Sequence, residues 1–289
     1  MNTSFQRVAV VTGASAGIGL AAAKALAAQG WRIIAIGRNP QRTAAAEQEI
    51  RSVSSSDQVN MLQADLALMA DAARLVDEIA NLTDRVDVLI NNAGGMASQK
   101  VITPEGLEEN FAGNHLGPFL LTTRLLPLLR RAAKDAPKGS VRILNTSSDG
   151  SEMIPGMNLD DLQTFETYSN GLAYCSGKLA NVLFARALAK RLQADGIVAH
   201  AFHPGTVGSN FFSHTDASVQ ERYRDMDKLT PEQGADTLIW LATDEEPGNS
   251  NGGYFYERKP RTPNPLVDDA ALVERLWEVS EQLIAKAMA

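Results

Sequence analysis

Short apolar runs alternate with longer segments of helical periodicity along most of this chain. The runs of strand length lie at residues 8–12, 32–36, 59–63, 86–90, 141–145, 198–202 and 254–256. The segments of helical periodicity lie at residues 18–29, 41–51, 69–81, 104–134, 172–194, 231–243 and 267–288. Continuous apolar strands separated by helices indicate βαβ units and a parallel sheet covered on both faces. We therefore expect an α/β fold, a single doubly wound parallel sheet of about seven strands, as one domain over residues 1–289.

Two longer stretches interrupt this alternation, at residues 149–170 and 205–228. Each follows a predicted strand on its carboxyl side, where open α/β sheets bind their ligands. Loops of this length are usually lids or binding segments, so we interpret both as substrate loops, with plain surface elaboration as the alternative. Their apolar residues favour a hydrophobic substrate, unless these side chains only pack the loops onto the body. They are Met153, Ile154, Met157, Leu159, Phe165, Tyr168, Phe211, Phe212, Tyr223 and Met226.

The first predicted strand ends in a glycine-rich turn, Thr12-Gly13-Ala14-Ser15-Ala16-Gly17-Ile18-Gly19, and a helix follows at once. Glycines permit the tight turn and let the backbone approach a pyrophosphate, while the helix start offers free N–H groups. Glycines also simply make turns, but strand, turn and helix in this order predict a dinucleotide site of the Rossmann type. The expected contacts are Gly13, Ser15, Ala16, Gly17, Ile18 and Gly19.

The end of the second strand predicts which dinucleotide is bound. An NAD site usually places an Asp or Glu there, to accept hydrogen bonds from the ribose hydroxyls. This segment reads Ala35-Ile36-Gly37-Arg38-Asn39-Pro40-Gln41-Arg42 and contains no carboxylate. A guanidinium forks onto a phosphate with charge-assisted hydrogen bonds, so Arg38 predicts NADP. The alternative is a solvated arginine at a helix start.

Tyr174 and Lys178 lie four residues apart in a predicted helix and share one of its faces. A tyrosine with its ordinary pKa of about 10 is a poor proton shuttle at neutral pH, and a nearby ammonium would lower that pKa. The fifth strand leads into Asn145-Thr146-Ser147-Ser148, whose hydroxyls would reach the same edge of the sheet. This placement makes Tyr174 and Lys178 candidates for general acid–base chemistry.

The composition is that of an ordinary soluble protein, with 44% hydrophobic and 21% charged residues. A net charge of −7 argues against a nucleic-acid binder. The one cysteine, Cys175, can form neither an internal disulfide nor a zinc cluster, which fits a reducing cytoplasm. The most apolar stretch, 116–129, is broken by Gly, Pro, Thr and Arg, so we expect no membrane span. Only six residues precede Arg7, where the first apolar strand is expected to begin, so we expect no signal peptide.

Several motifs occur in an order and spacing typical of one family. Gly13, Gly17 and Gly19 fit the pattern TGxxxGxG, and Asn91-Asn92-Ala93-Gly94 fits the signature NNAG after the fourth strand. Ser148 fits a catalytic serine, and Tyr174 and Lys178 fit a YxxxK pair. Asn114 fits an asparagine in the helix after NNAG, and Pro204-Gly205 fits a PG turn. Over nearly its whole length the chain thus resembles the short-chain dehydrogenase/reductase family.

The resemblance implies catalytic roles at four positions. Tyr174 would be the general acid in carbonyl reduction or the base in alcohol oxidation. Lys178 would lower the pKa of Tyr174 and hold the nicotinamide ribose. Ser148 would hydrogen-bond the substrate oxygen where negative charge develops, with Ser147 as the less favoured alternative. Asn114 would hold a water that links Lys178 to solvent.

The resemblance also implies further cofactor contacts. Asp65 and Leu66, after the third strand, would read the adenine. The other implied contacts lie after the fourth and sixth strands, at Asn92, Ala93, Gly94, Pro204, Gly205 and Thr206.

A closer resemblance is to the retinol dehydrogenase branch of this family, through residues 114–119, 172–184 and 203–205. That branch prefers NADP and acts on apolar alcohols or aldehydes. The chain departs from it at Gly177, where a serine is usual, and in the expected lack of an N-terminal anchor. Retinoid itself is therefore not predicted.

We predict a cytoplasmic, NADP(H)-dependent oxidoreductase of the carbonyl reductase type that acts on an apolar small molecule. The alternatives are an NAD-dependent polyol, sugar or steroid dehydrogenase and a catalytically silent NADP-sensing regulator. We expect no nucleic-acid or membrane partner. We also expect no metal, because His200 and His203 point to opposite faces of one strand. His115 and Cys175 are interpreted as packing residues. A homo-oligomer is left open, because the apolar residues of the Tyr174 helix could serve core or interface.

Overall fold

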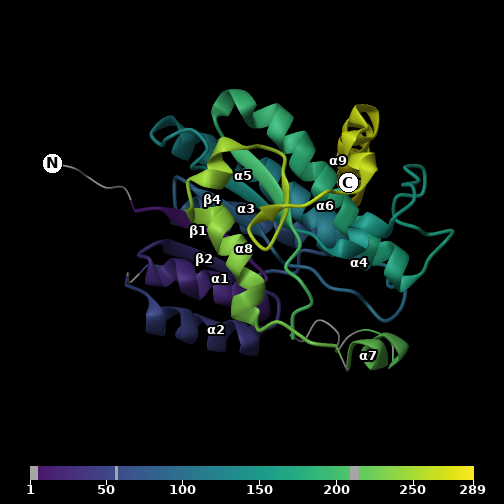
Figure 1. Cartoon of the computed structure of the whole chain (residues 1–289), viewed down its shortest axis with the longest axis horizontal. Helices are drawn as coiled ribbons and strands as arrows, with labels where there is room; N and C mark the ends of the chain where they lie inside the picture. Colours follow the sequence, from purple (N-terminus) through teal and green to yellow (C-terminus); the bar gives the residue numbers. More distant parts are fainter. Residues whose placement is uncertain (1–5, 56–57, 209–214, 216, 225) are drawn as a thin grey trace.

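The computed structural model describes residues 6–55, 58–208, 215, 217–224 and 226–289, and in this part of the chain the strands form one sheet (Figure 1). The strands are β1 (Val8–Thr12), β2 (Arg32–Gly37), β3 (Val59–Gln63), β4 (Val88–Asn91), β5 (Arg142–Thr146), β6 (Val198–Phe202), β7 (Tyr254–Tyr256) and β8 (Lys259–Pro260). Their spatial order is β3-β2-β1-β4-β5-β6-β7-β8. The order reverses between β1 and β4, which is where such sheets bind ligands. The predicted doubly wound sheet is confirmed.

The sheet of the described residues has eight strands rather than about seven. Neighbouring strands from β3 to β7 pair in parallel, and β8 joins β7 antiparallel after a turn at Glu257 and Arg258 with φ of 49° and 58°. Because β8 has two exposed residues and no apolar run, hydrophobic patterning gives no signal for it.

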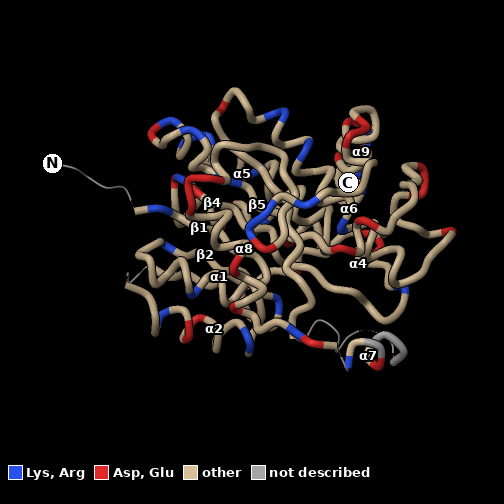
Figure 2. Tube along the Cα trace, viewed as in Figure 1, with Lys and Arg blue, Asp and Glu red and all other residues tan. Residues whose placement is uncertain are grey.

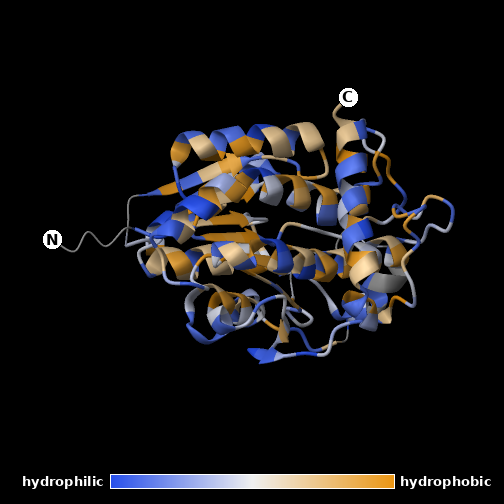
Figure 3. Cartoon of the chain, turned by 90° about the horizontal axis from the view of Figure 1, so that it is seen from above, coloured by the Kyte–Doolittle hydropathy of each residue, from blue (hydrophilic) through white to orange (hydrophobic). Residues whose placement is uncertain are grey.

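Two layers of helices cover the sheet (Figure 3). The helices are α1 (Gly17–Ala28), α2 (Pro40–Val53), α3 (Met69–Leu82), α4 (Glu109–Phe111), α5 (Gly117–Lys134), α6 (Asn170–Leu192), α7 (Ala217–Arg224), α8 (Pro231–Thr243) and α9 (Ala270–Ala287). One buried cluster joins the sheet to α1, α2 and α8, and the other joins it to α3, α5, α6 and α9. Burial on both faces explains why the strands are continuously apolar.

The helix predicted at 104–134 begins later and is not uniform. Gly106, with φ of 79°, lies in a turn, and regular helix starts at Glu109. A π-helical turn at Ala112–Leu116 then separates α4 from α5. Such turns often occur at functional sites, and this one contains Asn114. The C-terminal helix predicted from 267 also starts later, at Ala270, where the Asp269 carboxylate accepts two backbone N–H bonds.

The two interpreted substrate loops carry some regular structure. Residues 149–170 begin with a 3₁₀ turn at Asp149–Met153, and residues 205–228 contain α7. Two of their predicted apolar residues, Phe211 and Phe212, lie outside the described residues.

Both positive and negative side chains lie on the outer helices of the described chain, and α5 carries only positive ones (Figure 2). Among the residues that the structure describes, no helix is both long and apolar enough to cross a membrane.

Candidate active site

The glycine-rich turn packs directly against the segment that follows β4. The Thr12 hydroxyl accepts hydrogen bonds from the Asn92 and Ala93 backbone N–H groups at 2.9 and 3.0 Å. A Cβ on Gly13, whose φ is +68°, would lie 2.9 Å from the Cα of Ala93, and a Cβ on Gly19 would lie 2.3 Å from the Gly13 carbonyl oxygen. Neither position has room for a side chain, so the glycines permit this close backbone packing.

The start of α1 lies at the carboxyl edge of the sheet, beside this turn. Its N-cap residue Ala16 has no side-chain acceptor, and the first helical turn contains no acidic residue. The first N–H groups of a helix carry partial positive charge and suit an anion. The bare helix start and the close-packed glycines therefore fit a dinucleotide.

Arg38 follows β2 at the same edge. Its side chain is 57% exposed, and its Nη1 lies 3.5 Å from Asp65 Oδ2 and 3.6 Å from Glu109 Oε1. A cavity of about 490 Å³ opens beside it, lined also by Gln63, Ala64, Asp65, Asp71 and Arg74. The structure thus brings together Arg38 and Asp65, while Leu66 is buried in the core next to them.

Ser148 lies directly after β5 and caps the turn that follows. Its hydroxyl accepts a hydrogen bond from the Gly150 N–H at 3.2 Å and donates to Asp149 Oδ1 at 3.0 Å. Ser147 faces the other way: it is buried, and its hydroxyl donates to the Lys178 carbonyl oxygen at 2.8 Å. Of the two serines, Ser148 is the one whose hydroxyl faces the turn.

Tyr174 and Lys178 come from the second and third turns of α6, which Ser169 caps. Burial raises the pKa of Tyr174, and a hydrogen bond with Ser148 opposes that shift. Lys178 Nζ lies 5.6 Å from the centre of the Tyr174 ring and donates to the Thr146 carbonyl oxygen at 3.3 Å. Burial lowers the pKa of Lys178 to about 8.

Asn114 reaches the same place from the π-helical turn. Its Nδ2 donates to the Gly95 and Asn110 carbonyl oxygens, both at 2.8 Å, while its Oδ1 is buried with no hydrogen-bond partner. A Cβ on Gly94 would lie 2.4 Å from this Oδ1 and 3.0 Å from Lys178 Nζ. The two polar atoms therefore lie close to one point beside Gly94, where a side chain would clash with both.

The turn after β6 closes the edge of the site. Gly205 has φ of +81°, and the Thr206 carbonyl oxygen accepts the Leu229 N–H at 2.8 Å. A Cβ on Gly234 of α8 would lie 2.4 Å from Val207 and 3.3 Å from Ile18. This segment and the start of α1 therefore both pack against α8 at Gly234.

His115, His200 and Cys175 are held by contacts within the fold. His115 is buried among aromatic rings with Nε2 2.9 Å from Ser280 Oγ, and burial lowers its pKa to about 4. His200 uses both ring nitrogens, Nε2 with the Pro247 carbonyl oxygen and Nδ1 with the Gly253 N–H. Cys175 Sγ lies 2.7 Å from where a Gly150 Cβ would be, so it packs on the turn after Ser148.

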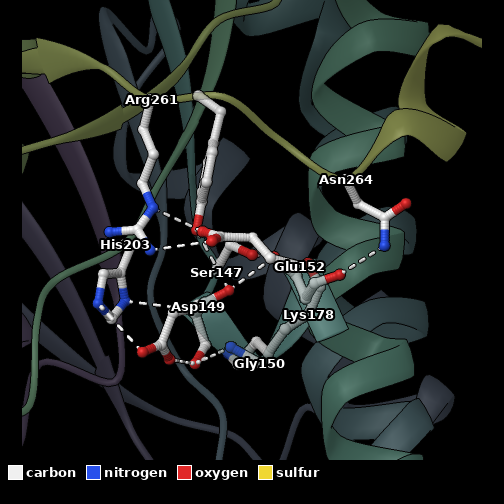
Figure 4. A network of polar contacts seen from close by, with 11 residues as sticks. Ser147, Asp149, Gly150, Glu152, Lys178, His203, Arg261 and Asn264 are labelled. Carbon is white, nitrogen blue, oxygen red and sulfur yellow. Dashed lines mark hydrogen bonds and ion pairs between the residues drawn. The ribbon is translucent and has the colours of Figure 1, made fainter. Parts of the chain in front are cut away.

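A set of polar residues around that turn has no counterpart among the sequence predictions (Figure 4). Glu152, Tyr254, Arg261 and Asn264 form hydrogen bonds and an ion pair that hold residues 148–154. No local spacing joins the turn to these residues, because Tyr254, Arg261 and Asn264 lie 102 to 113 residues after the groups of the turn that they contact.

The chain belongs to the short-chain dehydrogenase family, because the family model for short chain dehydrogenases matches residues 7–220. Within the family it belongs to the retinol dehydrogenase-like branch. Retinol dehydrogenase 13 of Homo sapiens is 35% identical over 288 residues, covering 96% of this chain and 84% of the relative. Retinol dehydrogenase 12 of Homo sapiens is 36% identical, covering 96% and 86%. The human polyprenol dehydrogenase is 34% identical, covering 95% and 84%.

Solved structures agree on the fold. The NADP active-site complex of RhlG from Pseudomonas aeruginosa superposes with a TM-score of 0.69 at 27% identity, covering 88% of this chain and 97% of that one. A 3-ketoacyl-(acyl-carrier-protein) reductase from Brucella melitensis gives 0.67 at 22% identity, covering 86% and 95%, and shows the fold alone. The protein is therefore an oxidoreductase of a family that binds nicotinamide cofactors.

Proposed function

We propose that the protein transfers hydride between NADP(H) and a carbonyl or alcohol carbon, with Tyr174 as the general acid or base. The observation that carries the proposal is the meeting of four polar side chains, two of which lie beside Gly94. Ser148 comes from the end of β5, Tyr174 and Lys178 from α6, and Asn114 from the π-helical turn. The nicotinamide supplies or accepts the hydride when it is bound.

Tyr174 and Ser148 would act together on the reacting oxygen. The hydrogen bond between Tyr174 and Ser148 supports this role, because it brings the two side chains close enough to act on one reacting oxygen. In reduction Tyr174 gives its proton to that oxygen as negative charge develops there, and Ser148 donates a stabilising hydrogen bond. The buried Lys178 ammonium, with few other partners, favours the phenolate that remains.

Asn114 supports proton resupply. Its unpartnered Oδ1 and Lys178 Nζ lie near the same point beside Gly94, so a water held there could hydrogen-bond both. The buried asparagine would then connect the ammonium to solvent after each turnover.

Arg38 supports NADP over NAD. No carboxylate follows β2, and Arg38 lies beside the cavity with its guanidinium exposed. The 27% identical RhlG was solved with NADP. The observation that favours NAD instead is the pair of carboxylates, Asp65 and Glu109, which already lie near Arg38 and would repel a phosphate.

An apolar substrate fits the loop after Ser148. Met153 is 79% exposed and Phe165 38%, while Ile154 is buried and only packs the loop onto the core. Two relatives are named as dehydrogenases of retinol and of polyprenol, which are both apolar alcohols. We propose residues 149–170 as a substrate loop on these grounds, within a single catalytic domain.

The test is NADPH and NADH oxidation against benzaldehyde, nonanal, cyclohexanone and menadione, with Tyr174→Phe alongside. We expect turnover with NADPH that falls by about 10²–10⁴-fold in the variant. Ser148→Ala should lose about 10²-fold, and Ser147→Ala much less, because Ser147 reaches only the backbone of Lys178.

Two results would contradict the proposal. NADPH binding without turnover on the panel, together with an unchanged Tyr174→Phe variant, would indicate the cofactor-sensing regulator. Equal turnover with NADH, unchanged by Arg38→Asp, would contradict the role of Arg38 and favour the NAD alternative.

A further inference from the structure

The turn that carries Ser148 is held by side chains from the C-terminal segment 254–264 (Figure 4). The Tyr254 hydroxyl lies 3.2 Å from the Ser148 carbonyl oxygen and 3.1 Å from Glu152 Oε1. Asn264 Nδ2 donates to the Ser151 and Ile154 carbonyl oxygens at 3.1 and 2.7 Å. The backbone on both sides of the turn is therefore fixed from outside it.

Arg261 and Glu152 add an ion pair to this arrangement. Arg261 Nε and Nη2 donate to the two oxygens of Glu152 at 2.6 and 2.9 Å, a two-pronged ion pair between side chains that are only 31% and 26% exposed. The guanidinium also lies over the Tyr256 ring, 5.2 Å from its centre. A planar fork held on both prongs fixes the carboxylate in orientation as well as in position.

The fixed carboxylate in turn restrains Tyr254. A phenol has one proton, and Glu152 Oε1 and the Ser148 carbonyl oxygen are both within reach of it. Burial raises the pKa of Tyr254, so its hydroxyl stays protonated and able to donate. The contacts run without a gap from Arg261 through Glu152 and Tyr254 to the backbone of Ser148.

On the other side of the turn, His203 Nδ1 accepts the Asp149 N–H at 3.2 Å. The Ser148 hydroxyl lies between these supports, where it meets the Gly150 N–H and the Asp149 carboxylate. A shift of the turn would therefore move the hydroxyl relative to Tyr174, which is held on a different element, α6.

We infer that Arg261, acting through Glu152 and Tyr254, is a positioning residue that sets the Ser148 hydroxyl for reaction. The inference rests on the proposed function, because it gives Ser148 its role. None of the three side chains needs to touch the substrate.

The test is a double-mutant cycle between Arg261→Ala and Ser148→Ala, with kcat measured on the panel carbonyl that the protein reduces fastest. Arg261→Ala should lower kcat about 10-fold, since displacements of an ångström or less cost factors of this size. The dissociation constant of NADPH, read from its fluorescence, should change less than about 2-fold. In the Ser148→Ala background, Arg261→Ala should cause no further loss, because the group it positions is gone.

Arg191→Ala is the matched control. Arg191 forms the same kind of two-pronged pair, with Glu274 at 3.3 and 2.5 Å, and lies over the Trp277 ring at 4.0 Å, but at the far end of α6. Its loss should lower stability without lowering kcat. If Arg261→Ala does not fold, Tyr254→Phe replaces it in the cycle, since it removes one hydroxyl and leaves the ion pair. Arg261→Lys, which keeps the charge without the fork, should recover only part of kcat.

The failures are distinguishable. An equal kcat loss from Arg261→Ala with and without Ser148, or an equal loss from Arg191→Ala, would overturn this inference and leave the proposed function standing. A Ser148→Ala variant with unchanged kcat would overturn both.

Discussion

The two sides of the site are built in different ways. On the cofactor side, Gly13 and Gly19 let three backbone segments meet closely, and the contacts are mostly between backbone and the Thr12 hydroxyl. On the substrate side, side chains hold the turn after Ser148 across separations of 106 to 113 residues. The cofactor side requires positions with no side chain at Gly13 and Gly19, whereas the substrate side requires the long side chains of Tyr254, Arg261 and Asn264. We therefore expect an added methyl group to disrupt the cofactor side more than the substrate side. We expect truncation of a side chain to have the opposite pattern.

The largest effect should come from Gly19→Ala. The added methyl would lie 2.3 Å from the Gly13 carbonyl oxygen, a backbone atom that cannot move aside without opening the glycine-rich turn. We expect NADPH binding to weaken by about 10²-fold or more and stability to fall by about 1–3 kcal/mol. Fluorescence titration with NADPH and urea unfolding measure the two.

Gly156→Ala is the control on the substrate side, because a Cβ there meets nothing within 4 Å. It should leave both quantities nearly unchanged. Equal losses in the two variants would show that the contrast between the sides is wrong.

Lys178→Met should separate activity from stability. Lys178 has a folded pKa of about 8, below its ordinary 10.5, because its ammonium is buried. Between these values the folded chain binds fewer protons than the unfolded chain, so the free energy of unfolding rises with pH from about 8 to 10.5. Below about 8 the folded state bears the full cost of burying the charge.

Methionine removes that cost. At pH 7 we expect Lys178→Met to be more stable than the parent by on the order of 1–3 kcal/mol, with the advantage shrinking toward pH 10. The Thr146 carbonyl oxygen keeps its bond from Asn181 at 3.1 Å, so no acceptor is left unpaired. Turnover should be lost at every pH. Urea unfolding at both pH values checks this, and a variant less stable than the parent at pH 7 would contradict it.

Arg38→Ala should have a smaller and more selective effect. Loss of a charge-assisted contact to the ribose phosphate should weaken NADPH binding about 10-fold and leave NADH binding unchanged. Glu109→Gln, which removes a carboxylate 3.6 Å from Arg38, should strengthen NADPH binding about 2-fold. Parallel titrations with the two cofactors decide the matter, and an equal loss for both in Arg38→Ala would remove Arg38 from cofactor choice.

The difference between the two sides also explains what the sequence reveals. The doubly wound sheet follows from apolar runs buried on both faces, and the glycine-rich turn follows from residues adjacent in the chain. The two exposed residues of β8 leave no pattern, and the π-helical turn lies inside a continuous helical periodicity. The Arg261–Glu152 ion pair could not be predicted from the sequence, because each charged residue lies in a polar segment and is expected to face solvent. Only the folded structure brings the two side chains together. The roles of the candidate site residues stay predictions.

The smallest effect should come from Gly171→Ala, and it should raise stability where Gly19→Ala lowers it. Gly171 is the second residue of α6 on the substrate side, and an added Cβ meets nothing within 4 Å. Alanine loses less conformational freedom than glycine on folding, so stability should rise by about 0.4–1 kcal/mol. NADPH binding should not change, because the substitution lies outside the glycine-rich turn. Urea unfolding measures the gain. The same chemical change would then stabilise one side of the site and disrupt the other, whereas a loss of stability here would mean that glycine at the start of α6 is also required by packing.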